Sequence, residues 1–420
     1  GIILLSRKGL TEHSLPGDGP IQAVFQEDGV FGGDVFSVSG GMLYREASLI
    51  GPVEVHGPVF IAASADELAV CGSGPLYRYD GSTLTAVAFP DDALVAKVVF
   101  HDGLFLAARL NTQKWYFSAV LDADTWDALD FGSAESSPDN ILDMAIMNDT
   151  MWLFGSNSIE PHANTGDADL PYQRIEQRIF TKGVRATGTV VALDNTLFFV
   201  GSDGLVYRLG EVPERISDNG IEERIAQSAS VTCFGFIFEG HAFYSIRLDD
   251  GTFAFDASTE QWCEMQTNGG QFRGCCACMD GTTAILGDDS DGILWTFGGY
   301  ADGDDALTRL FTAGAHIDGG TLIVDNLLIE ANVGWTELLS GQGSDPVLEV
   351  RFSRDAGATW GDWRPVSLGT QGHYRNKAEV RRCGMFDFPG MLCEARVTDP
   401  VPFRVSGALI NEPGGGRGRG

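Results

Sequence analysis

The residues SRDAGATW, near the C-terminal end of the chain, read S-x-D-x-G-x-T-W. The motif residues are Ser353, Asp355, Gly357, Thr359 and Trp360. Short hydroxyl and carboxylate side chains accept hydrogen bonds from nearby backbone N–H groups, and glycine permits a sharp bend. The spacing therefore predicts a hairpin turn that Ser353 and Asp355 hold, with Trp360 plugged into the fold.

This motif resembles the Asp-box of sialidases and other propeller glycosidases. Such an enzyme also needs an arginine cluster for the substrate carboxylate and a Tyr/Glu nucleophile pair. The chain has one clean copy of the motif, and no FRIP-like start accompanies it. We therefore predict no enzymatic activity and no catalytic residues, with a glycan-binding or sialidase-like propeller protein as the alternative.

Other chemistry-bearing motifs are missing from the sequence. It contains no G-x-S-x-G elbow, P-loop, dinucleotide-binding fingerprint or H-E-x-x-H pair. The only cysteine cluster, CCAC at 275–278, lacks the second pair that a zinc site requires. The stretch GDDSDG at 287–292 lacks the ligand spacing of a calcium loop and is typical of a hairpin turn. We expect no cofactor and no metal site.

One local charge feature could mediate recognition. Six basic side chains lie close together in the sequence of an otherwise acidic chain; they are Arg364, His373, Arg375, Lys377, Arg381 and Arg382. A solvated strand pair would explain them. The alternative is a docking surface for an acidic neighbour, such as a second copy of this protein.

The overall charge limits the classes of partner. The chain has 420 residues and a formal net charge of −30. Such an acidic surface repels phosphate, so we expect no sequence-specific nucleic-acid partner. No apolar run approaches the roughly 20 residues that span a bilayer, so we expect no membrane span.

The elements that must position these residues are predicted to be β-strands. Apolar runs separated by Gly, Asp and Asn turns recur along the chain, with first turns near Gly40, Asp66, Asp102, Asn148, Asp194, Glu239 and Asp280. Most gaps between these turns are about 40 residues, the length of a four-stranded propeller blade. The pattern predicts an all-β protein that begins with a β-propeller of six or seven blades. The best helical window is short, at residues 217–227, with a serine N-cap.

Beyond residue 300 the strands become longer and alternate in polarity, as at Leu348, Val350 and Phe352. Alternation with one buried face predicts a β-sandwich-like C-terminal domain. The predicted organisation is an N-terminal arm at 1–20, a β-propeller at 21–300, a β-sandwich at 301–410 and a disordered Gly/Arg tail at 411–420.

The middle of the chain carries a family resemblance. The segments WDALDFGSAESSPDNI (126–141), MWLFGSNSIE (151–160) and YRLGEVPERISDNGIEERI (207–225) resemble the packaged-DNA stabilisation proteins, also called tail accessory or hub proteins, of short-tailed bacteriophages. The C-terminal segment from Ser353 to Gly384 is similar to the end module of the same family.

This resemblance implies a structural virion protein of the phage tail, assembled in the host cytoplasm. It implies a hub that connects the portal–adaptor complex to spikes, fibres or a needle and helps to retain packaged DNA. The implied partners are further copies of the chain, in a cyclic oligomer expected to be a hexamer, a portal or adaptor ring protein, and a tail spike, fibre or needle protein. A generic propeller interaction module of a cell is a third hypothesis.

Overall fold

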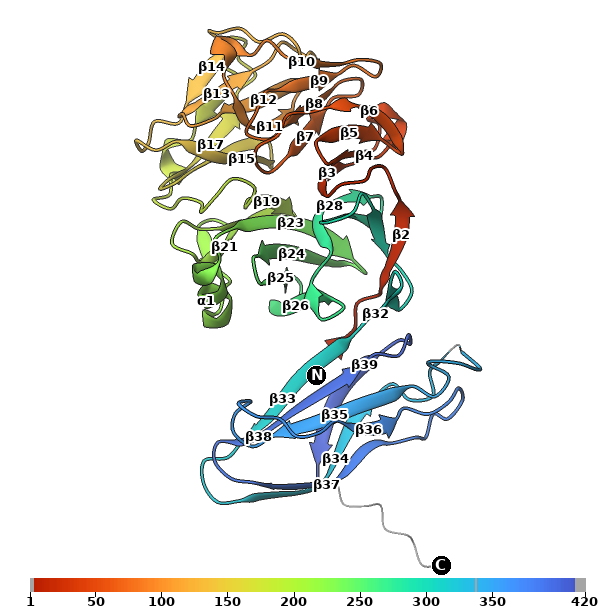
Figure 1. Ribbon diagram of the computed structural model, residues 1–420. Helices are drawn as coiled ribbons and strands as arrows, with labels where there is room; N and C mark the ends of the chain where they lie inside the picture. The colour runs from red at the N-terminus through yellow and green to blue at the C-terminus, as the bar shows by residue number, and fades with distance from the viewer. Residues whose placement is uncertain (1–3, 337, 412–420) are drawn as a thin grey trace, which may run out of the picture. The chain divides into compact units, whose positions relative to one another are not determined.

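The computed structural model describes residues 4–336 and 338–411. These residues form two compact units, one built from 12–266 and 270–296, the other from 4–11, 267–269 and the described residues after 296. Strands dominate both (Figure 1). The Gly/Arg tail predicted at 411–420 lies outside the described residues, apart from Asn411.

The first unit is a β-propeller. Its described residues form seven sheets, one for each blade. The blade number is therefore seven, within the predicted range of six or seven. Blades 1 to 3 comprise β3 (Ile21–Phe25), β4 (Phe36–Ser39), β5 (Met42–Arg45), β6 (Ser48–Pro52); β7 (Phe60–Ala63), β8 (Leu68–Cys71), β9 (Tyr77–Tyr79), β10 (Leu84–Ala86); and β11 (Val95–His101), β12 (Leu104–Arg109), β13 (Lys114–Phe117), β14 (Phe131–Ser133).

The remaining blades follow the same order along the chain. Blades 4 and 5 comprise β15 (Ile141–Met147), β16 (Thr150–Gly155), β17 (Ile159–Asn164), β18 (Tyr172–Arg174); and β19 (Val191–Leu193), β20 (Thr196–Val200), β21 (Val206–Leu209), β22 (Pro213–Arg215). Blades 6 and 7 comprise β23 (Val231–Phe238), β24 (His241–Leu248), β25 (Gly251–Asp256), β26 (Gln261–Thr267), β27 (Gly270–Gln271); and β28 (Gly274–Asp280), β29 (Thr283–Asp288), β30 (Leu294–Phe297) with β2 (Leu10–Ser14). Short 3-10 turns occur at η1 (Phe31–Gly33), η2 (Pro90–Asp92) and η3 (Glu176–Arg178).

Tight hairpin turns connect the first and second strands of most blades. In blade 3, Asp102 and Gly103 have φ values of 50° and 79°, and in blade 6, Glu239 and Gly240 have 50° and 84°. Two successive positive φ values match the right-handed twist of the flanking strands. Asp-Gly and similar pairs tolerate these values, so they predict the hairpins of the blades. Gly40 differs from the other predicted turns, because it joins the second and third strands of blade 1. That shift explains the short first gap in the repeat.

The propeller closes on itself through strands from opposite ends of the chain. The first strands of successive blades contact one another in a cycle that ends with β28 against β3. Blade 7 takes β2, from the N-terminal segment, as the strand next to β30. Pairing the two ends of the ring in one sheet removes open edges that would otherwise be exposed.

Apolar contacts between neighbouring blades form the propeller core. Phe36 and Val38 of blade 1 pack in one cluster with Leu68 and Val70 of blade 2, and all four side chains are fully buried. Equivalent clusters join the later blades. A single blade cannot bury both of its faces, so stacking the blades side by side supplies the burial.

The predicted short helix is present as α1 (Asn219–Gln227). Its N-cap is Asp218, whose carboxylate accepts the N–H of Ile221 at 2.9 Å, rather than the serine that the sequence suggested. Ile221 and Ile225, four residues apart, form the buried side of the helix.

The second unit is a β-sandwich of two four-stranded sheets. One sheet has the order β1 (Leu4–Leu5), β39 (Arg404–Ile410), β34 (Leu322–Ala331), β37 (Ala378–Phe386). The other has the order β33 (Arg309–His316), β38 (Gly390–Val397), β35 (Val347–Ser353), β36 (Arg364–Ser367). The small strands β31 (Ala301–Asp302) and β32 (Asp305–Ala306) precede them.

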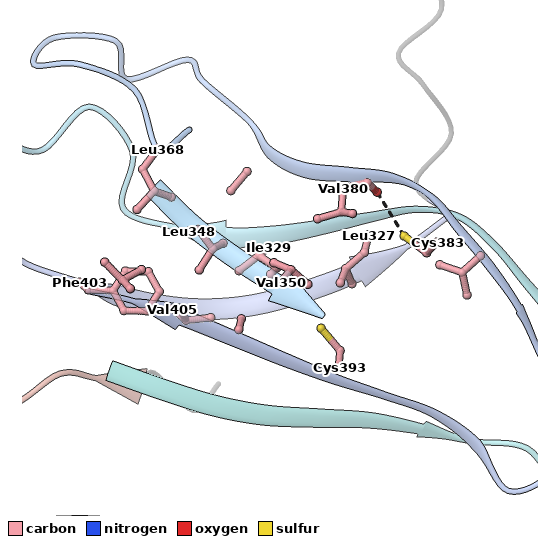
Figure 2. Packing of buried hydrophobic residues seen from close by; sticks show 14 of the residues in the cluster. Leu327, Ile329, Leu348, Val350, Leu368, Val380, Cys383, Cys393, Phe403 and Val405 are labelled. Carbon is pink, nitrogen blue, oxygen red and sulfur yellow. Dashed lines mark hydrogen bonds between the residues drawn. The ribbon is translucent and has the colours of Figure 1, made fainter. Parts of the chain in front are cut away.

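Alternating apolar residues from both sheets fill the sandwich core, as Figure 2 shows. Leu327 and Ile329 of β34 and Leu348 and Val350 of β35 are each at most 3% exposed. Every second residue of these strands points to the same face, so Leu328 and Glu349, which lie between the buried residues, face outward and are partly exposed.

Residues 4–11 of the N-terminal segment are part of this second unit. Within the range predicted as an arm, β1 pairs with β39, and Leu10 pairs in parallel with Asp302. Arg7 donates to both carboxylate oxygens of Asp302, at 2.7 and 2.6 Å, and Asp302 is only 1% exposed. This two-point ion pair fixes the segment before β2 begins.

Candidate functional site

The predicted Asp-box turn lies at the end of β35. Asp355 accepts the N–H of Thr359 at 2.8 Å and its hydroxyl at 2.5 Å. The hydroxyl of Ser353 donates to Asp355 at 2.8 Å and accepts the N–H of Gly357 at 2.9 Å. These bonds, chiefly those from Thr359, lower the pKa of Asp355 to about 2. The two side chains thus satisfy the backbone of a turn that would otherwise depend on water.

Trp360 does not enter the sandwich core. It lies partly exposed on the outer face, where the Arg351 guanidinium is 4.9 Å from its ring and 4.4 Å from that of Trp363. Arg396 stacks on the other ring, at 4.1 Å from Trp363. The expectation that Trp360 plugs the fold was wrong, because the turn directs the indole along the sheet toward an arginine.

Ion pairs between β35 and β38 complete this stack. Arg351 pairs with Glu394 at 2.5 Å, and Arg396 pairs with Glu349 at 2.7 Å. Each pair is formed by residues directly opposite each other in the sheet. The sequence signal that could have revealed the stack was the alternation of charges on both strands, next to the W-G-D-W segment.

The six predicted basic residues separate into two groups. Arg364 of β36 donates to the carbonyl oxygens of Arg381 and Arg382 on β37. Arg382 has a φ of 56° in a bulge, and Arg381 pairs with Glu379 at 2.9 Å. We call Arg364, Arg381 and Arg382 the edge group, because β36 and β37 are terminal strands of their sheets. Charges and bulges on terminal strands discourage unwanted strand pairing.

The other three basic residues, His373, Arg375 and Lys377, lie in the loop between β36 and β37. The sequence did not suggest the aromatic side chains beside them. Tyr374 of the same loop and Trp335 of the loop after β34 have ring centroids 6.3 Å apart, and they are 63% and 62% exposed. We call Trp335, His373, Tyr374, Arg375 and Lys377 the loop surface. Contact between residues about 40 positions apart gave no local signal in the sequence.

Most arginines of the propeller are neutralised by carboxylates. Those paired within 4 Å are Arg45, Arg78, Arg109, Arg174, Arg208, Arg215, Arg224 and Arg247. By contrast, among the described residues the side chains of Arg375 and Arg382 have no hydrogen-bond or ion-pair partner. Both of these unpaired arginines belong to the sandwich unit.

Several buried titratable groups contribute to the packing of the propeller. Lys97 of blade 3 lies 2.5 Å from Asp143 of blade 4, which also accepts the N–H of Gly188 at 2.8 Å on the way into blade 5. Burial raises the pKa of the Cys71 and Cys233 thiols to about 12. A thiol with a raised pKa is a poor nucleophile and a poor metal ligand.

Asp288, in the stretch that looked like a calcium loop, is fully buried. Its carboxylate accepts the indole N–H of Trp295 at 2.7 Å and the N–H of Ser290 at 2.9 Å. These contacts make it a hairpin clamp like Asp355. Across residues 4–336 and 338–411 no group of three or more His, Cys, Asp and Glu residues could hold a metal ion.

In that same part of the chain, no helix is long and apolar enough to cross a membrane.

Two family models match this chain, one for each unit. The family model described as the β-propeller of bacteriophage P22 Gp10 matches residues 4–298, and that described as its β-sandwich matches residues 308–412. The tail hub protein gp10 of Salmonella phage P22 is 26% identical over 290 residues, 62% of this chain. The chain spans 61% of the length of that relative.

Solved structures show weaker similarity. The computationally designed Ika8 protein matches 70% of this chain and 99% of its own, with 13% identity and a TM-score of 0.43. The extracellular domain of a putative one-component system from B. thetaiotaomicron matches 87% of this chain and 55% of its own, with 12% identity and a TM-score of 0.47.

Proposed function

The chain belongs to the bacteriophage P22 Gp10 family, and on this premise we propose that it is a structural virion protein that acts as a hub of a phage tail. The observation that carries the proposal is the succession of two family models, 4–298 and 308–412, over nearly the whole chain. The relative with the matching sequence is named for this role in its own phage.

In the proposed hub, the chain connects the portal–adaptor complex to the tail and helps to retain packaged DNA. Its partners are further copies of itself in a cyclic oligomer, expected to be a hexamer, a portal or adaptor ring protein, and a spike, fibre or needle protein. Its place is the tail of the virion, after assembly in the host cytoplasm. The net charge of −30 supports this role, because an acidic surface does not hold DNA that passes it.

The proposed role is scaffolding without catalysis. The one Asp-box turn holds its own backbone and an outward Arg–Trp stack, as expected of a structural turn. The edge group and the loop surface are proposed as docking surfaces for an acidic neighbour.

Assembly on a purified portal–adaptor complex tests the proposal. The chain, mixed with adaptor-capped particles, should add a ring beneath the adaptor in cryo-electron microscopy and should reduce the release of packaged DNA. A matched sample with portal alone, without adaptor, should remain bare. A chain that stays unbound, or that instead hydrolyses a fluorogenic sialoside, would contradict the hub role and favour the glycan-directed alternative.

A further inference from the structure

The loop surface lies at the end of the sandwich where β33 begins and β1 pairs with β39. Its two aromatic side chains are more than half exposed, and Leu339 in the same loop as Trp335 is 84% exposed. Large apolar side chains beside arginine are the composition of protein-binding surfaces rather than of ordinary solvated loops.

This surface is preformed. The N–H of Gly334 donates to the carbonyl of Leu368 at 2.9 Å, and the N–H of Gly372 donates to the carbonyl of Gly334 at 3.1 Å. Gly334 has a φ of 68°, and a Cβ atom there would lie 2.7 Å from the carbonyl carbon of His373. Two loops interlocked in this way lose little entropy when they bind a partner.

The propeller carries a surface of complementary character. The loop between β13 and β14, residues 118–130, contains four aspartates, and the neighbouring loop of blade 4 adds Asp167 and Asp169. Val120 and Leu129 in the first loop are 72% and 82% exposed. We call these two loops the acidic surface.

The acidic surface is also rigid. The indole of Trp126 is buried beside Phe89, with ring centroids 5.1 Å apart, and its N–H donates to the carbonyl of Ala123 at 2.8 Å. Burial, and then the negative charges of Asp127 and Asp169, raise the pKa of Asp130. Same-sign crowding of this kind is relieved when a cation approaches.

We propose that the loop surface of one copy of this chain docks on the acidic surface of a second copy. The inference rests on the proposed self-assembly of the hub and names the surfaces through which it occurs. Arg375 and Lys377 face the aspartates, while Trp335 and Tyr374 cover Val120 and Leu129.

A second copy suits these surfaces better than an unrelated acidic protein, because the chain itself carries both halves of the contact. Two different surfaces that bind head to tail produce a heterologous interface, which closes into a ring when the rotation between copies permits. Opposite charges at such a contact fix the partner and its orientation.

Charge reversal on each side tests the proposal. The variants are Arg375→Glu with Lys377→Glu on the loop surface, and Asp124→Lys with Asp169→Lys on the acidic surface. In the described part of the chain neither of these two aspartate side chains accepts a hydrogen bond, so the second variant keeps its turns intact. Native mass spectrometry of the full-length chain should show that each variant alone loses assembly, by about tenfold or more in dissociation constant.

Mixing the two variants provides the decisive result. Each interface in the mixture then joins either two native surfaces or two reversed surfaces, so assembly should return as an alternating oligomer. The control pair Asp66→Lys with Glu211→Lys changes charge equally at exposed sites outside both surfaces and should assemble as the wild type does.

The outcomes separate this inference from the hub role. If the wild type assembles and both variants still do so, or if the mixture stays apart, these surfaces are not the interface and a different acidic partner is indicated. If the wild type itself remains monomeric in solution while it binds the portal–adaptor complex, the self-docking inference is overturned and the hub role stands.

Discussion

The carboxylate of Asp355 accepts both the backbone N–H and the hydroxyl of Thr359, at 2.8 and 2.5 Å. One side chain therefore closes the turn that follows β35 and directs the next residue, Trp360, over Arg351. In this protein the Asp-box links a turn to a surface stack of arginine and tryptophan.

Replacement of Asp355 by Ala should destabilise the sandwich in a pH-dependent way. The pKa of about 2 in the folded state lies below the ordinary value of an unfolded aspartate. The ionised carboxylate thus stabilises the fold fully above about pH 4 and loses this effect as the pH falls through about 2. Urea midpoints should differ most between Asp355→Ala and wild type near neutral pH and converge under acid.

The control for this experiment is Asp362→Ala, in the same connection, whose side chain is exposed and has no hydrogen-bond partner in the described structure. It should match the wild type at every pH. An equal loss in both variants would show that the turn does not depend on the Asp355 carboxylate.

Replacement of Asp288 by Ala should cost about 2–4 kcal/mol of unfolding free energy, because it leaves the indole N–H of Trp295 and turn amides without an acceptor. Tryptophan fluorescence during urea unfolding measures the change. Asp291→Ala, an exposed neighbour in the same turn, should have little effect. A stability loss that follows Asp291 rather than Asp288 would reverse the assignment.

Lys97 and Asp143 form a buried ion pair, so removal of either partner leaves a buried charge without its counter-ion. Lys97→Met should destabilise the propeller by about 3–5 kcal/mol, because Asp143 is then buried without its cation. The double variant with Asp143→Asn should recover part of that loss, since the carboxylate charge is gone. Calorimetry of the single and double variants measures the coupling; a double variant no more stable than Lys97→Met would exclude it.

Arg351→Lys should weaken the stack although it keeps the charge. Lysine lacks the planar guanidinium that lies between two indoles and pairs with Glu394, and we expect a loss of about 1–2 kcal/mol. The near-UV circular dichroism of the tryptophans should change with it. Arg404→Lys is the matched control, because the side chain of Arg404 is exposed and has no partner among the described residues. A similarly large change in Arg404→Lys would show that the effect does not come from the stack of Arg351 on the tryptophans.

Much of the fold could be predicted because its signals are local. Turns rich in Asp, Asn, Glu and Gly marked the hairpin between the first and second strands in six of the seven blades. In four of these turns both central residues have positive φ values, which only a few residue types tolerate. Gly40 marked a different hairpin in blade 1, because the connection after β3 is long and contains η1 instead of a tight turn.

The candidate sites were predicted less completely. The Asp-box hydrogen bonds join residues within five positions of one another, so the spacing of the motif predicted them. The direction of Trp360 depended on Arg351 and Glu394, which come from two different strands. The sequence placed the six basic residues in one cluster. In the structure they divide between the edge group and the loop surface, because β36 and β37 belong to different sheets.

The sequence by itself determined the elements of this protein: the strands, their turns, the Asp-box and the order of propeller and sandwich. Only the tertiary structure decided that β2 completes blade 7, that Arg7 pairs with Asp302 across 295 positions, and that Trp335 meets Tyr374. Local hydrogen bonds and alternation are properties of consecutive residues, whereas these contacts form when distant segments bury surface together. That choice depends on the packing of the whole chain.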